Sequence, residues 1–274
     1  MLISIVIANW NTKELMIDCL NSIYSIEEYN SLGDDLEVIV VDNGSKDGSI
    51  EAIKDKFPMV ILIENKVNLG YAPACNQGMK ISKGEYVLLL GSDTVLTNGS
   101  LKIPLEKLQT ENDLGAVGCK LIYPDGRLQG NLKKFPTLKN AFYTYLSLDK
   151  LNYDYDMLWF NYNKEIYADQ PATTFLMVRN EILKKINYFD ESYKILYNDV
   201  DLCKRIWDAG KKIKFIPDAV VIHHGSYSTN KARFKIRRIM YEDIFRYFYR
   251  NFGMMAIFLI PVLFFRLLVV SFLK

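Results

Sequence analysis

Short apolar runs that each end in a polar or glycine-rich turn limit the fold of this sequence more than any other feature. Three of them lie in the first half of the 274-residue chain, at positions 2–8, 36–41 and 86–90. They are rich in Val and Ile and show little alternation of apolar with polar side chains, which is typical of strands covered on both faces. The sequence therefore predicts buried strands of a parallel sheet.

Segments with helical spacing separate these runs. Residues 12–24, 49–57 and 72–81 repeat apolar side chains every three or four positions, and a further short apolar run at 60–63 precedes the last of them. Strands that alternate with helices over short connections predict a doubly wound sheet. The fold class that we expect is α/β, with a mostly parallel, Rossmann-like sheet flanked by helices.

The polar residues that follow the strands identify a candidate ligand site. In doubly wound sheets, ligands bind beyond the carboxyl ends of the strands. Three dipeptides stand at such ends in this sequence, and we expect them along one edge of the sheet: Ala8-Asn9, Asp42-Asn43 and Ser92-Asp93. The first half of the chain is therefore interpreted as a nucleotide-binding half.

The second half of the sequence is less regular. The elements expected there are strands at 114–123, 212–216 and 220–222, a helix over 200–209, and a further apolar run at 173–179. Residues 131–168 are rich in Tyr, Phe, Leu and Asn, and their periodicity is weak. We interpret this segment as a mobile or acceptor-facing insert.

Composition and charge exclude several classes of protein. Half of the residues are hydrophobic and 24% are charged, which excludes a disordered or low-complexity chain. The formal net charge of +2 is too small for nucleic-acid binding to be the main function. Residues 231–250 hold seven basic and two acidic side chains, a charge of +5 that leaves −3 for the rest of the chain. The positive charge is therefore concentrated near the C-terminal end.

The cysteines and the first residues bear on the compartment. Cys19, Cys75, Cys119 and Cys203 are scattered and form no Cys-x-x-Cys pair. We expect neither a disulfide framework nor a structural zinc site, and a reducing, cytosolic location. The apolar run at 2–8 has no basic flank and no small-residue cleavage site, so it predicts a strand and not a signal peptide.

Two aspartates that follow apolar strands are candidates for ligand contacts. The carboxylate of Asp42 can accept hydrogen bonds from a base imide or a ribose hydroxyl, although an Asx turn with a helix N-cap explains the same run without a ligand. Asp93 follows a deeply apolar strand, where an unpaired charge is costly. Its carboxylate can bind Mg²⁺ or Mn²⁺, although a lone aspartate at a strand exit also serves as a helix N-cap.

Segment 68–78 is rich in small residues, which allow a backbone to approach a ligand closely. Asn76 lies in the first turns of the helix expected at 72–81, and the N-terminus of that helix can face a diphosphate. The alternative is a helix packed tightly on the sheet through its alanines. Neither a Gly-x-Gly-x-x-Gly nor a Walker motif occurs here, which disfavours an ordinary dinucleotide or P-loop site.

Acids and imidazoles in the second half are further candidates. Asp199 and Asp201 stand in the first turn of an expected helix, where the macrodipole favours acids. Apolar surroundings and a neighbouring acid can tune one of them into a general base. His223 and His224 follow an apolar run. A satisfied core histidine is the usual interpretation of such a residue, but an imidazole here is also a natural partner for a metal held by Asp93.

These motifs occur together in a characteristic order. Ile-Val-Ile-x-Asn, Val-Asp-Asn-Gly-Ser, Asn-x-Gly and Gly-Glu-Tyr-x-x-x-Leu-x-x-Asp precede Phe-Asp-Glu, Asp-x-Asp-Leu-x-x-Arg and Val-x-His. The order resembles the family-2 glycosyltransferases of the GT-A type over residues 3–230. Within that family it is most similar to the rhamnosyltransferase-like group that builds bacterial polysaccharides.

The resemblance implies roles for particular residues. A nucleotide-sugar donor, a dTDP- or UDP-sugar, would be bound by Ala8, Asn9, Asp42, Asn68, Asn76 and Ser92. Asp93 would be the aspartate of the metal-binding loop, and His223 a further ligand of Mg²⁺ or Mn²⁺. Asp199 would be the catalytic base of an inverting, single-displacement transfer. The acceptor would be a glycan or a lipid-linked molecule in cell-surface polysaccharide synthesis.

Two positions depart from the family pattern. Gly91-Ser92-Asp93 lacks the first acid of an Asp-x-Asp loop, and Asn198-Asp199 stands where the family has a Glu-Asp pair. A catalytically degenerate scaffold is therefore one alternative. A nucleotidyltransferase is another, but Asn9-Trp10-Asn11-Thr12 does not resemble the glycine- and basic-rich phosphate loop of that class.

The C-terminal segment predicts contact with a membrane. Residues 253–273 contain a single charge, Arg266, and residues 233–250 interleave basic with aromatic side chains, as in an amphipathic helix on an anionic surface. We expect a catalytic domain over 1–230 and membrane-associating helices over 231–274 at the cytoplasmic face of the cell membrane. Residues 253–273 would insert shallowly, or as a short re-entrant or spanning helix. The alternative is that this segment packs against its own domain or against a second copy in a homo-oligomer.

Overall fold

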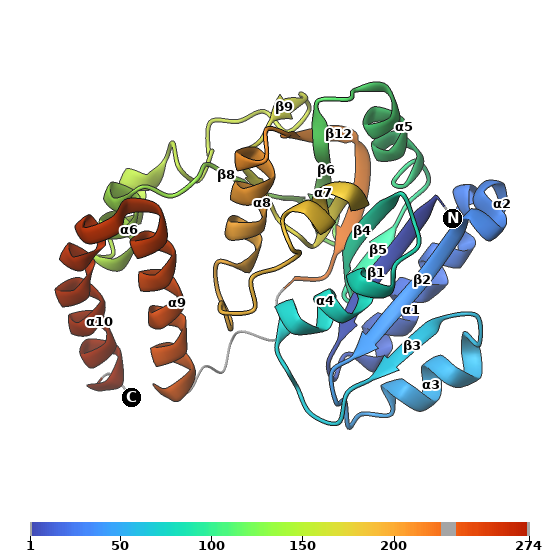
Figure 1. The fold of residues 1–274 in the computed structure, drawn as a ribbon, viewed down its shortest axis with the longest axis horizontal. Helices are drawn as coiled ribbons and strands as arrows, with labels where there is room; N and C mark the ends of the chain where they lie inside the picture. The colour runs from blue at the N-terminus through green and yellow to red at the C-terminus, as the bar shows by residue number, and fades with distance from the viewer. Residues whose placement is uncertain (1, 226–233, 273–274) are drawn as a thin grey trace.

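Parallel strands from the first half of the chain form one side of a mixed sheet. The computed structural model describes residues 2–225 and 234–272, and Figure 1 shows its elements. The strands lie in the order β3-β2-β1-β4 and run parallel to one another: β1 (Ile3–Asn9), β2 (Leu36–Asp42), β3 (Ile61–Glu64) and β4 (Tyr86–Gly91). The α/β class and the mostly parallel sheet that the sequence predicts are confirmed.

Helices follow the strands in alternation. The connections are made by α1 (Lys13–Ser25), α2 (Glu27–Leu32) with the turn η1 (Gly33–Asp35), α3 (Ser49–Lys56) and α4 (Tyr71–Ile81). The three longer helices lie where helical spacing predicts them. Local periodicity is sufficient here because each helix has one apolar side that covers the sheet.

Both faces of the sheet are buried, because side chains along a strand point alternately to opposite faces. Ile3, Ile5 and Ile7 of β1 belong to an apolar layer formed with α1, α3 and α5 (Lys102–Thr110). Val6 belongs to the opposite layer, formed with α4, α7 (Asn180–Lys185) and α8 (Asn198–Asp208). The runs of Val and Ile in the sequence reflect this double burial.

The other side of the sheet is mixed. β11 (Phe175–Arg179) lies antiparallel between β4 and β6 (Leu114–Ile122), and β6 also pairs with the short β7 (Leu128–Gln129). β12 (Lys212–His223) runs parallel to β6 and pairs antiparallel with β5 (Thr94–Leu96). The two strands predicted at 212–216 and 220–222 are one strand with a register shift between Ile216 and Val220, beside Pro217, which has no N–H to donate.

The insert at 131–168 is built from short elements. They are β8 (Leu132–Lys133), which pairs with β10 (Gln170–Pro171), then α6 (Leu138–Tyr145), the turn η2 (Asp149–Asn152), and β9 (Ile166–Tyr167), which pairs with β12. Leu132, Met157 and Tyr162 form a small buried cluster with Phe215 of β12. Elements of two to eight residues cannot produce a sustained periodicity, which explains the weak signal in the sequence.

The C-terminal segment is a helical hairpin. It consists of α9 (Phe234–Phe252), the 3₁₀ helix η3 (Gly253–Leu259) and α10 (Ile260–Phe272), and α9 and α10 lie side by side in Figure 1. Tyr247 and Phe248 of α9 are buried in a cluster with Tyr193, which precedes α8. The boundary expected between 1–230 and 231–274 lies outside the described residues.

Gly84, in the turn before β4, occupies a position that has no room for a side chain. A Cβ atom there would stand 2.5 Å from the backbone nitrogen of Ser4, whose hydroxyl accepts a hydrogen bond from the Gly84 N–H at 2.8 Å. We expect Gly84→Ala to lower the free energy of unfolding by about 1–3 kcal/mol in a urea titration. Gly130→Ala is the matched control, because its Cβ would meet only the Tyr162 hydroxyl at 3.5 Å. Equal losses in the two variants would contradict the prediction.

Candidate functional site

A cavity of about 380 Å³, hereafter the edge cavity, opens where the carboxyl ends of β1, β2 and β4 meet. Its walls are formed by Ala8, Asn9, Trp10, Thr12, Asn43, Asn68, Tyr71, Gly91, Ser92, Asp93, Thr173, Thr174 and His223. This wall contains seven of the residues that the sequence singles out: Ala8, Asn9, Asn43, Asn68, Ser92, Asp93 and His223.

Asp42 lies behind the wall of the edge cavity and does not reach its surface. The residue is fully buried, and both carboxylate oxygens are engaged. Oδ2 accepts a hydrogen bond from Asn9 Nδ2 at 2.7 Å, and Oδ1 accepts one from the Ser45 N–H at 2.8 Å. Asp42 therefore orients Asn9, which does reach the cavity.

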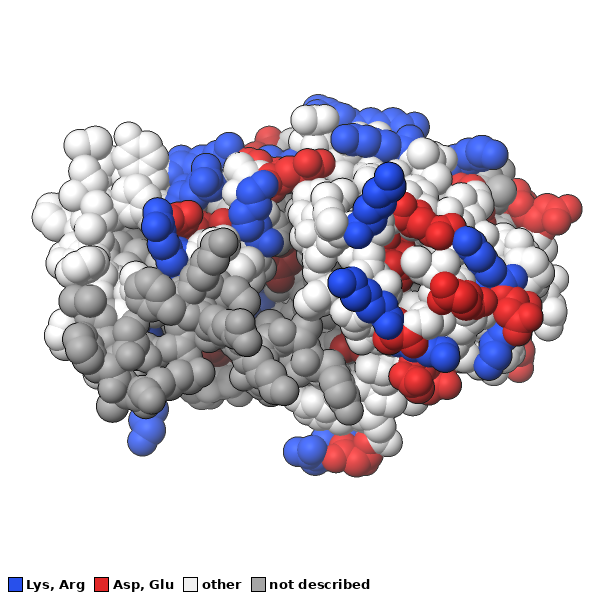
Figure 2. Space-filling view, turned by 90° about the horizontal axis from the view of Figure 1, so that it is seen from below, with Lys and Arg blue, Asp and Glu red and all other residues white. Residues whose placement is uncertain are grey.

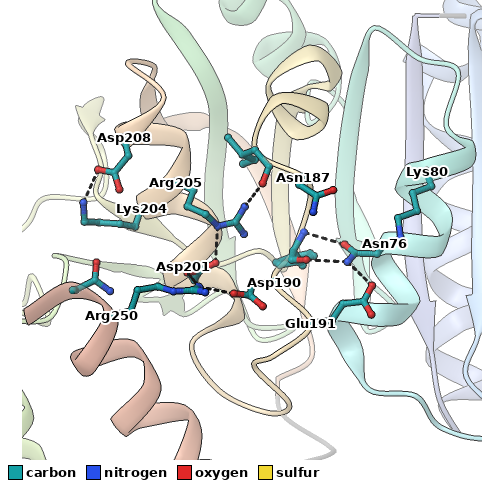
Figure 3. A pocket seen from close by; sticks show the side chains of 13 residues that line it. Asn76, Lys80, Asn187, Asp190, Glu191, Asp201, Lys204, Arg205, Asp208 and Arg250 are labelled. Atoms are coloured by element: carbon teal, nitrogen blue, oxygen red, sulfur yellow. Dashed lines mark hydrogen bonds and ion pairs between the residues drawn. The ribbon is translucent and has the colours of Figure 1, made fainter. Parts of the chain in front are cut away.

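Asn76 lies in another place, at a charged cavity of about 660 Å³ between α4, α8 and α9 (Figure 3). Its Nδ2 donates to the Phe189 carbonyl at 3.0 Å and to Glu191 Oε1 at 2.8 Å, and its Oδ1 accepts from the Phe189 N–H at 3.0 Å. Each polar atom of this buried side chain is thus used to tie α4 to the segment before α8. Helix α4 packs closely on the sheet through its small residues, which agrees with the alternative interpretation of segment 68–78.

Thr12 and Trp10 line the edge cavity, and the sequence alone predicts a role for neither of them. The Thr12 hydroxyl donates to Asn9 Oδ1 at 2.7 Å and lies 3.0 Å from the Ser92 hydroxyl, so it links the ends of β1 and β4. Trp10 is 46% exposed beside them. A tryptophan directly after a buried strand is the signal that identifies it, because an exposed indole at a cavity offers a face for a planar ligand.

Asp93 and His223 come together through the pairing of two strands. Antiparallel pairing of β12 with β5 sets His223 opposite Thr94, and His223 Nε2 lies 3.2 Å from Asp93 Oδ2. His223 Nδ1 lies 2.7 Å from Gln129 Oε1, on β7. Burial by itself raises the pKa of Asp93, but the hydrogen bond and the charge of His223, together with a backbone hydrogen bond and the charge of His224, outweigh burial, and the net effect is a lowered pKa.

The donor set of Asp93 and His223 fits a divalent ion. His223 Nδ1 can donate to Gln129 Oε1, and Nε2 then faces Asp93, so a metal bound by the two side chains would take the place of the Nε2 proton that joins them without it. A carboxylate oxygen and an imidazole nitrogen suit Mn²⁺, and carboxylate with ligand oxygens suits Mg²⁺. Among the residues that the structure describes, no group of three His, Cys, Asp or Glu side chains gathers around one point. The remaining ligands would be oxygens of a bound diphosphate and water.

Asp199 opens on a second cavity of about 230 Å³, which lies against the edge cavity. Its walls are formed by Tyr71, Thr173, Ile195, Leu196, Tyr197, Asn198 and Asp199. Tyr71 and Thr173 line both cavities, and their hydroxyls are 3.4 Å apart. The structure therefore brings Asp199 close to the cavity that contains Asp93 and His223.

Asp199 and Asp201 stand in the same helical turn but in different environments. Asp199 is partly buried, makes no ion pair with a described residue, and accepts a hydrogen bond from the adjacent Val200 N–H at 2.9 Å. Burial raises the pKa of its carboxyl. Asp201 is instead paired with Arg205 at 2.7 Å and with Arg250 at 3.5 Å (Figure 3). A base must be free to take a proton, which favours Asp199 over Asp201.

Comparison with known sequences places these residues in context. A sequence model described as "Glycosyl transferase family 2" matches residues 4–185, a range that includes Asp93 and ends before Asp199 and His223. An N-acetylglucosaminyl-diphospho-decaprenol L-rhamnosyltransferase of Mycobacterium tuberculosis is 27% identical over 221 residues, 72% of this chain and 69% of the relative. Abequosyltransferase RfbV of Salmonella typhimurium is 28% identical over 263 residues, 89% of this chain and 73% of the relative.

Solved structures share the fold. The mannosyltransferase PcManGT of Pyrobaculum calidifontis, in complex with GDP-Man and Mn²⁺, superposes with a TM-score of 0.62 at 18% identity over 91% of this chain. Residues 1–349 of S. aureus TarS, in complex with UDP-GlcNAc, superpose with a TM-score of 0.59 at 18% identity over 89% of this chain. The present chain spans 63% and 66% of the lengths of these two chains. At these identities the likeness concerns the fold, which is of the GT-A type.

Replacing the ionised carboxylate of Asp199 should stabilise the protein. Because the pKa of Asp199 is raised on folding, its contribution to stability is complete below the unfolded-state pKa, about 3.9, and is lost as the pH rises through the folded-state pKa. We expect Asp199→Asn to raise Tm at neutral pH, and the gain to shrink as the pH falls toward about 4. The measurement is a series of thermal melts at different pH values.

Asp201→Asn is the matched control for this experiment. Asp201 is buried and paired with two arginines, so its loss should lower the free energy of unfolding by about 3 kcal/mol. A fall in Tm for both variants would show that Asp199 is an ordinary structural acid.

Proposed function

The chain belongs to glycosyl transferase family 2 and is an inverting glycosyltransferase that uses a nucleotide-sugar donor; we propose here the residues, the metal and the acceptor with which it acts. One observation carries the proposal. Two cavities share a wall at Tyr71 and Thr173, and one holds the Asp93–His223 pair while the other holds the free carboxylate of Asp199. Donor and acceptor groups bound in the two cavities would meet at that wall.

The nucleoside diphosphate part of a UDP- or dTDP-sugar would lie in the edge cavity. Asn9, Asn68 and Ser92 supply polar groups there, and Ala8 permits close approach of the backbone. The exposed face of Trp10 is suited to stacking on the base. Asp42 and Asn76 would act indirectly, since the first orients Asn9 and the second holds the segment before α8.

Asp93 and His223 would hold Mg²⁺ or Mn²⁺ between the sheet edge and the diphosphate. The ion, when bound, neutralises charge that develops on the departing nucleoside diphosphate. Gln129 would accept the Nδ1 proton of His223, so that Nε2 could bind the ion in place of its own proton. Ser92 stands where an Asp-x-Asp loop has its first acid, so Asp93 would be the carboxylate ligand of this loop. The hydroxyl of Ser92 is hydrogen-bonded to that of Thr12.

Asp199 would be the general base. As an acceptor hydroxyl attacks the anomeric carbon, the new carbon–oxygen bond forms, the bond to the diphosphate oxygen breaks, and Asp199 takes the hydroxyl proton. Burial raises the pKa of Asp199, which strengthens it as a base. A partly buried carboxylate that forms no ion pair with a described residue is costly to a fold, so its presence favours an enzyme over a degenerate scaffold despite the Asn at position 198.

The acceptor that we propose is lipid-linked, at the cytoplasmic face of the membrane. Side chains on η3 and α10 are exposed and apolar: Met254 68%, Phe258 69%, Phe264 61% and Phe265 64%. In Figure 2 the described surface at the left end of the molecule, where the hairpin lies, is mainly white, whereas charges of both signs are interspersed on the right. Such a surface exceeds what a soluble monomer normally exposes.

The hairpin is suited to lying in a membrane surface. Among the described residues, the stretch Arg238–Leu267 is long and apolar enough, by length and composition, to cross a membrane. It is folded into two helices, however, and the 13 residues of α10 extend about 20 Å, against about 30 Å of hydrocarbon. Arg266 is also engaged elsewhere, because its Nη1 donates to the Tyr145 carbonyl at 3.1 Å and to the Ser147 hydroxyl at 2.9 Å, at the end of α6.

A groove of about 810 Å³ between α9 and α10 supports a lipid-linked acceptor over a free glycan. Its walls are mainly apolar, with arginines along α9: Arg238, Tyr241, Glu242, Phe245, Arg246, Tyr249, Arg250, Ile260, Leu263, Phe264 and Leu267. An apolar groove edged by cations complements a hydrocarbon chain that carries a diphosphate. The Mycobacterium tuberculosis relative is named for an acceptor of that chemistry.

Titration calorimetry of nucleotide sugars, with and without Mn²⁺, tests the assignment of the site. Asp93→Ala and His223→Ala should lose the Mn²⁺-dependent part of donor binding, whereas His224→Ala, next in the chain, should keep it. Asp199→Asn should bind the donor as the wild type does and turn over about 10²–10⁴-fold more slowly. The substrates are UDP-glucose, UDP-N-acetylglucosamine and dTDP-rhamnose, with N-acetylglucosaminyl-diphospho-decaprenol as acceptor. Unchanged binding in Asp93→Ala would remove this residue from the site.

Flotation with phosphatidylglycerol-containing vesicles tests the membrane contact. The wild-type protein should float with the vesicles, and the variant with Phe258, Phe264 and Phe265 changed to Ser should remain at the bottom of the gradient. The control changes Met59 and Val67 to Ser, because these side chains are 58% and 62% exposed on the nucleotide-binding half. If the wild type also stays at the bottom, the hairpin covers its apolar side with a second copy, which light scattering detects as a dimer.

A further inference from the structure

A buried carboxylate on α9 holds the backbone that leads into α8. Asp243 is 1% exposed, and three consecutive N–H groups converge on it. Its Oδ2 accepts hydrogen bonds from the N–H groups of Lys194 at 3.1 Å, Ile195 at 2.7 Å and Leu196 at 3.0 Å. Successive backbone N–H groups that point inward form a natural site for an anion, and here the anion is a side chain of the C-terminal hairpin.

A second tie joins α9 to the other side of the same segment. Arg250 Nη1 lies 2.5 Å from Asp190 Oδ2 and 3.5 Å from Asp201 Oδ1, and Figure 3 shows these three side chains together at the charged cavity. Between the two ties, the ring of Tyr197 packs on that of Tyr247 with centroids 4.7 Å apart. Residues 190–201 are therefore fixed to α9 along their whole length: at Asp190, at the backbone of 194–196, at Tyr197 and at Asp201.

The held segment forms the wall of the second cavity. Leu196, Tyr197 and Asp199 all line that cavity. Tyr197 has a φ of +66°, a left-handed conformation that costs a residue with a side chain of order 1 kcal/mol or more. Since Asp199 makes no ion pair with a described residue, its position depends on this backbone. A conformation of this kind persists only where surrounding contacts impose it.

We propose that Asp243 is a positioning residue for sugar transfer: by capping the N–H groups of 194–196, it fixes Asp199 relative to the acceptor hydroxyl. The inference rests on the function proposed above for Asp199. It gives the C-terminal hairpin a part in the reaction besides its contact with the membrane, because α9 completes the acceptor side of the active site. Packing by Tyr247 and Phe248 would hold α9 in place without Asp243, so the carboxylate specifies the conformation of the segment and not merely the docking of the helix.

The test uses Asp243→Asn in the full chain. The amide is the same size and its oxygen can take the place of Oδ2, but the negative charge is lost. Nδ2 would then stand in the place of Oδ1, which accepts from the Lys194 N–H at 3.1 Å, so a donor would face a donor and the remaining hydrogen bonds would be weaker. Hydrogen exchange should become about tenfold faster at the amides of 194–196, and kcat should fall about 10²-fold, with unchanged affinity for the donor selected by calorimetry. Glu106→Gln is the matched control: Glu106 is an exposed carboxylate on α5, away from both cavities and the groove, and it pairs with Lys102 at 4.0 Å on the helix surface. It should change neither exchange nor kcat.

Two results would overturn the proposal: amides that stay protected in Asp243→Asn, or amides that lose protection while kcat is retained. If Asp243→Asn does not fold, Asp243→Glu takes its place, since it keeps an acceptor carboxylate that is displaced by one methylene. The proposal would also be overturned if the amides of 194–196 lost protection in Asp243→Glu while kcat stayed at the wild-type value. A wild-type protein that transfers no sugar from any donor would count against the proposed function instead. The exchange measurement needs no substrate, so the two failures are distinguishable.

Discussion

The burial of the sheet on both faces is the constraint on which the rest of the structure depends. A polar group between two apolar layers costs several kcal/mol unless it is hydrogen-bonded, so the polar side chains of the strands are confined to the strand ends. Asn9 and Asp93 stand at or just beyond such ends and line the edge cavity. Ser4 and Glu37 are buried inside the sheet, but they hydrogen-bond to each other and to the turn at Lys83 and Gly84. The candidate site therefore lies at the edge of the sheet, where polar side chains can remain hydrated or hydrogen-bonded.

The mixed half of the sheet brings His223 next to Asp93, through an antiparallel pairing that a purely parallel sheet does not contain. β12 runs parallel to β6, and the short β5, which follows β4 directly in sequence, turns back to pair with it. This pairing carries His223 to Asp93, and the nearby β7 supplies Gln129 to fix the imidazole. One edge of the molecule thus combines the groups of three strands that are distant in the chain. The chemistry of the pair is then set by electrostatics, since the histidine lowers the pKa of Asp93 against the effect of burial.

Carboxylates around α8 differ in role because they differ in partners. Asp201 is neutralised by Arg205 and Arg250, and Asp243 is capped by three backbone N–H groups. Asp199 makes no ion pair with a described residue and accepts a single hydrogen bond, from the adjacent Val200 N–H. The first two fix backbone and helices in place, and the third keeps a raised pKa and a free oxygen. The same helix α9 supplies Arg250 and Asp243 and carries the hairpin with its exposed apolar side chains. The exposed apolar side of the hairpin and the contacts that hold the segment before α8 are therefore parts of one structural unit.

The sequence by itself determined the elements of the first half and the strand ends where the site lies, because the periodicity of apolar side chains reports burial along a single element and the strand-end rule follows from topology. It also identified Asp93, His223 and Asp199 as candidates, although their roles rested on a resemblance. It did not determine that Asp42 stands behind Asn9, or that Asn76 ties α4 to the segment before α8. Nor did it determine that Gln129 and Thr12 join the candidate site, or that the C-terminal hairpin contacts the rest of the chain through Asp243. These contacts join residues from different elements, and in most cases the partners are far apart in the chain. Only the tertiary structure decides them, since a side chain's hydrogen-bond partners depend on which elements pack together and not on the local pattern around it.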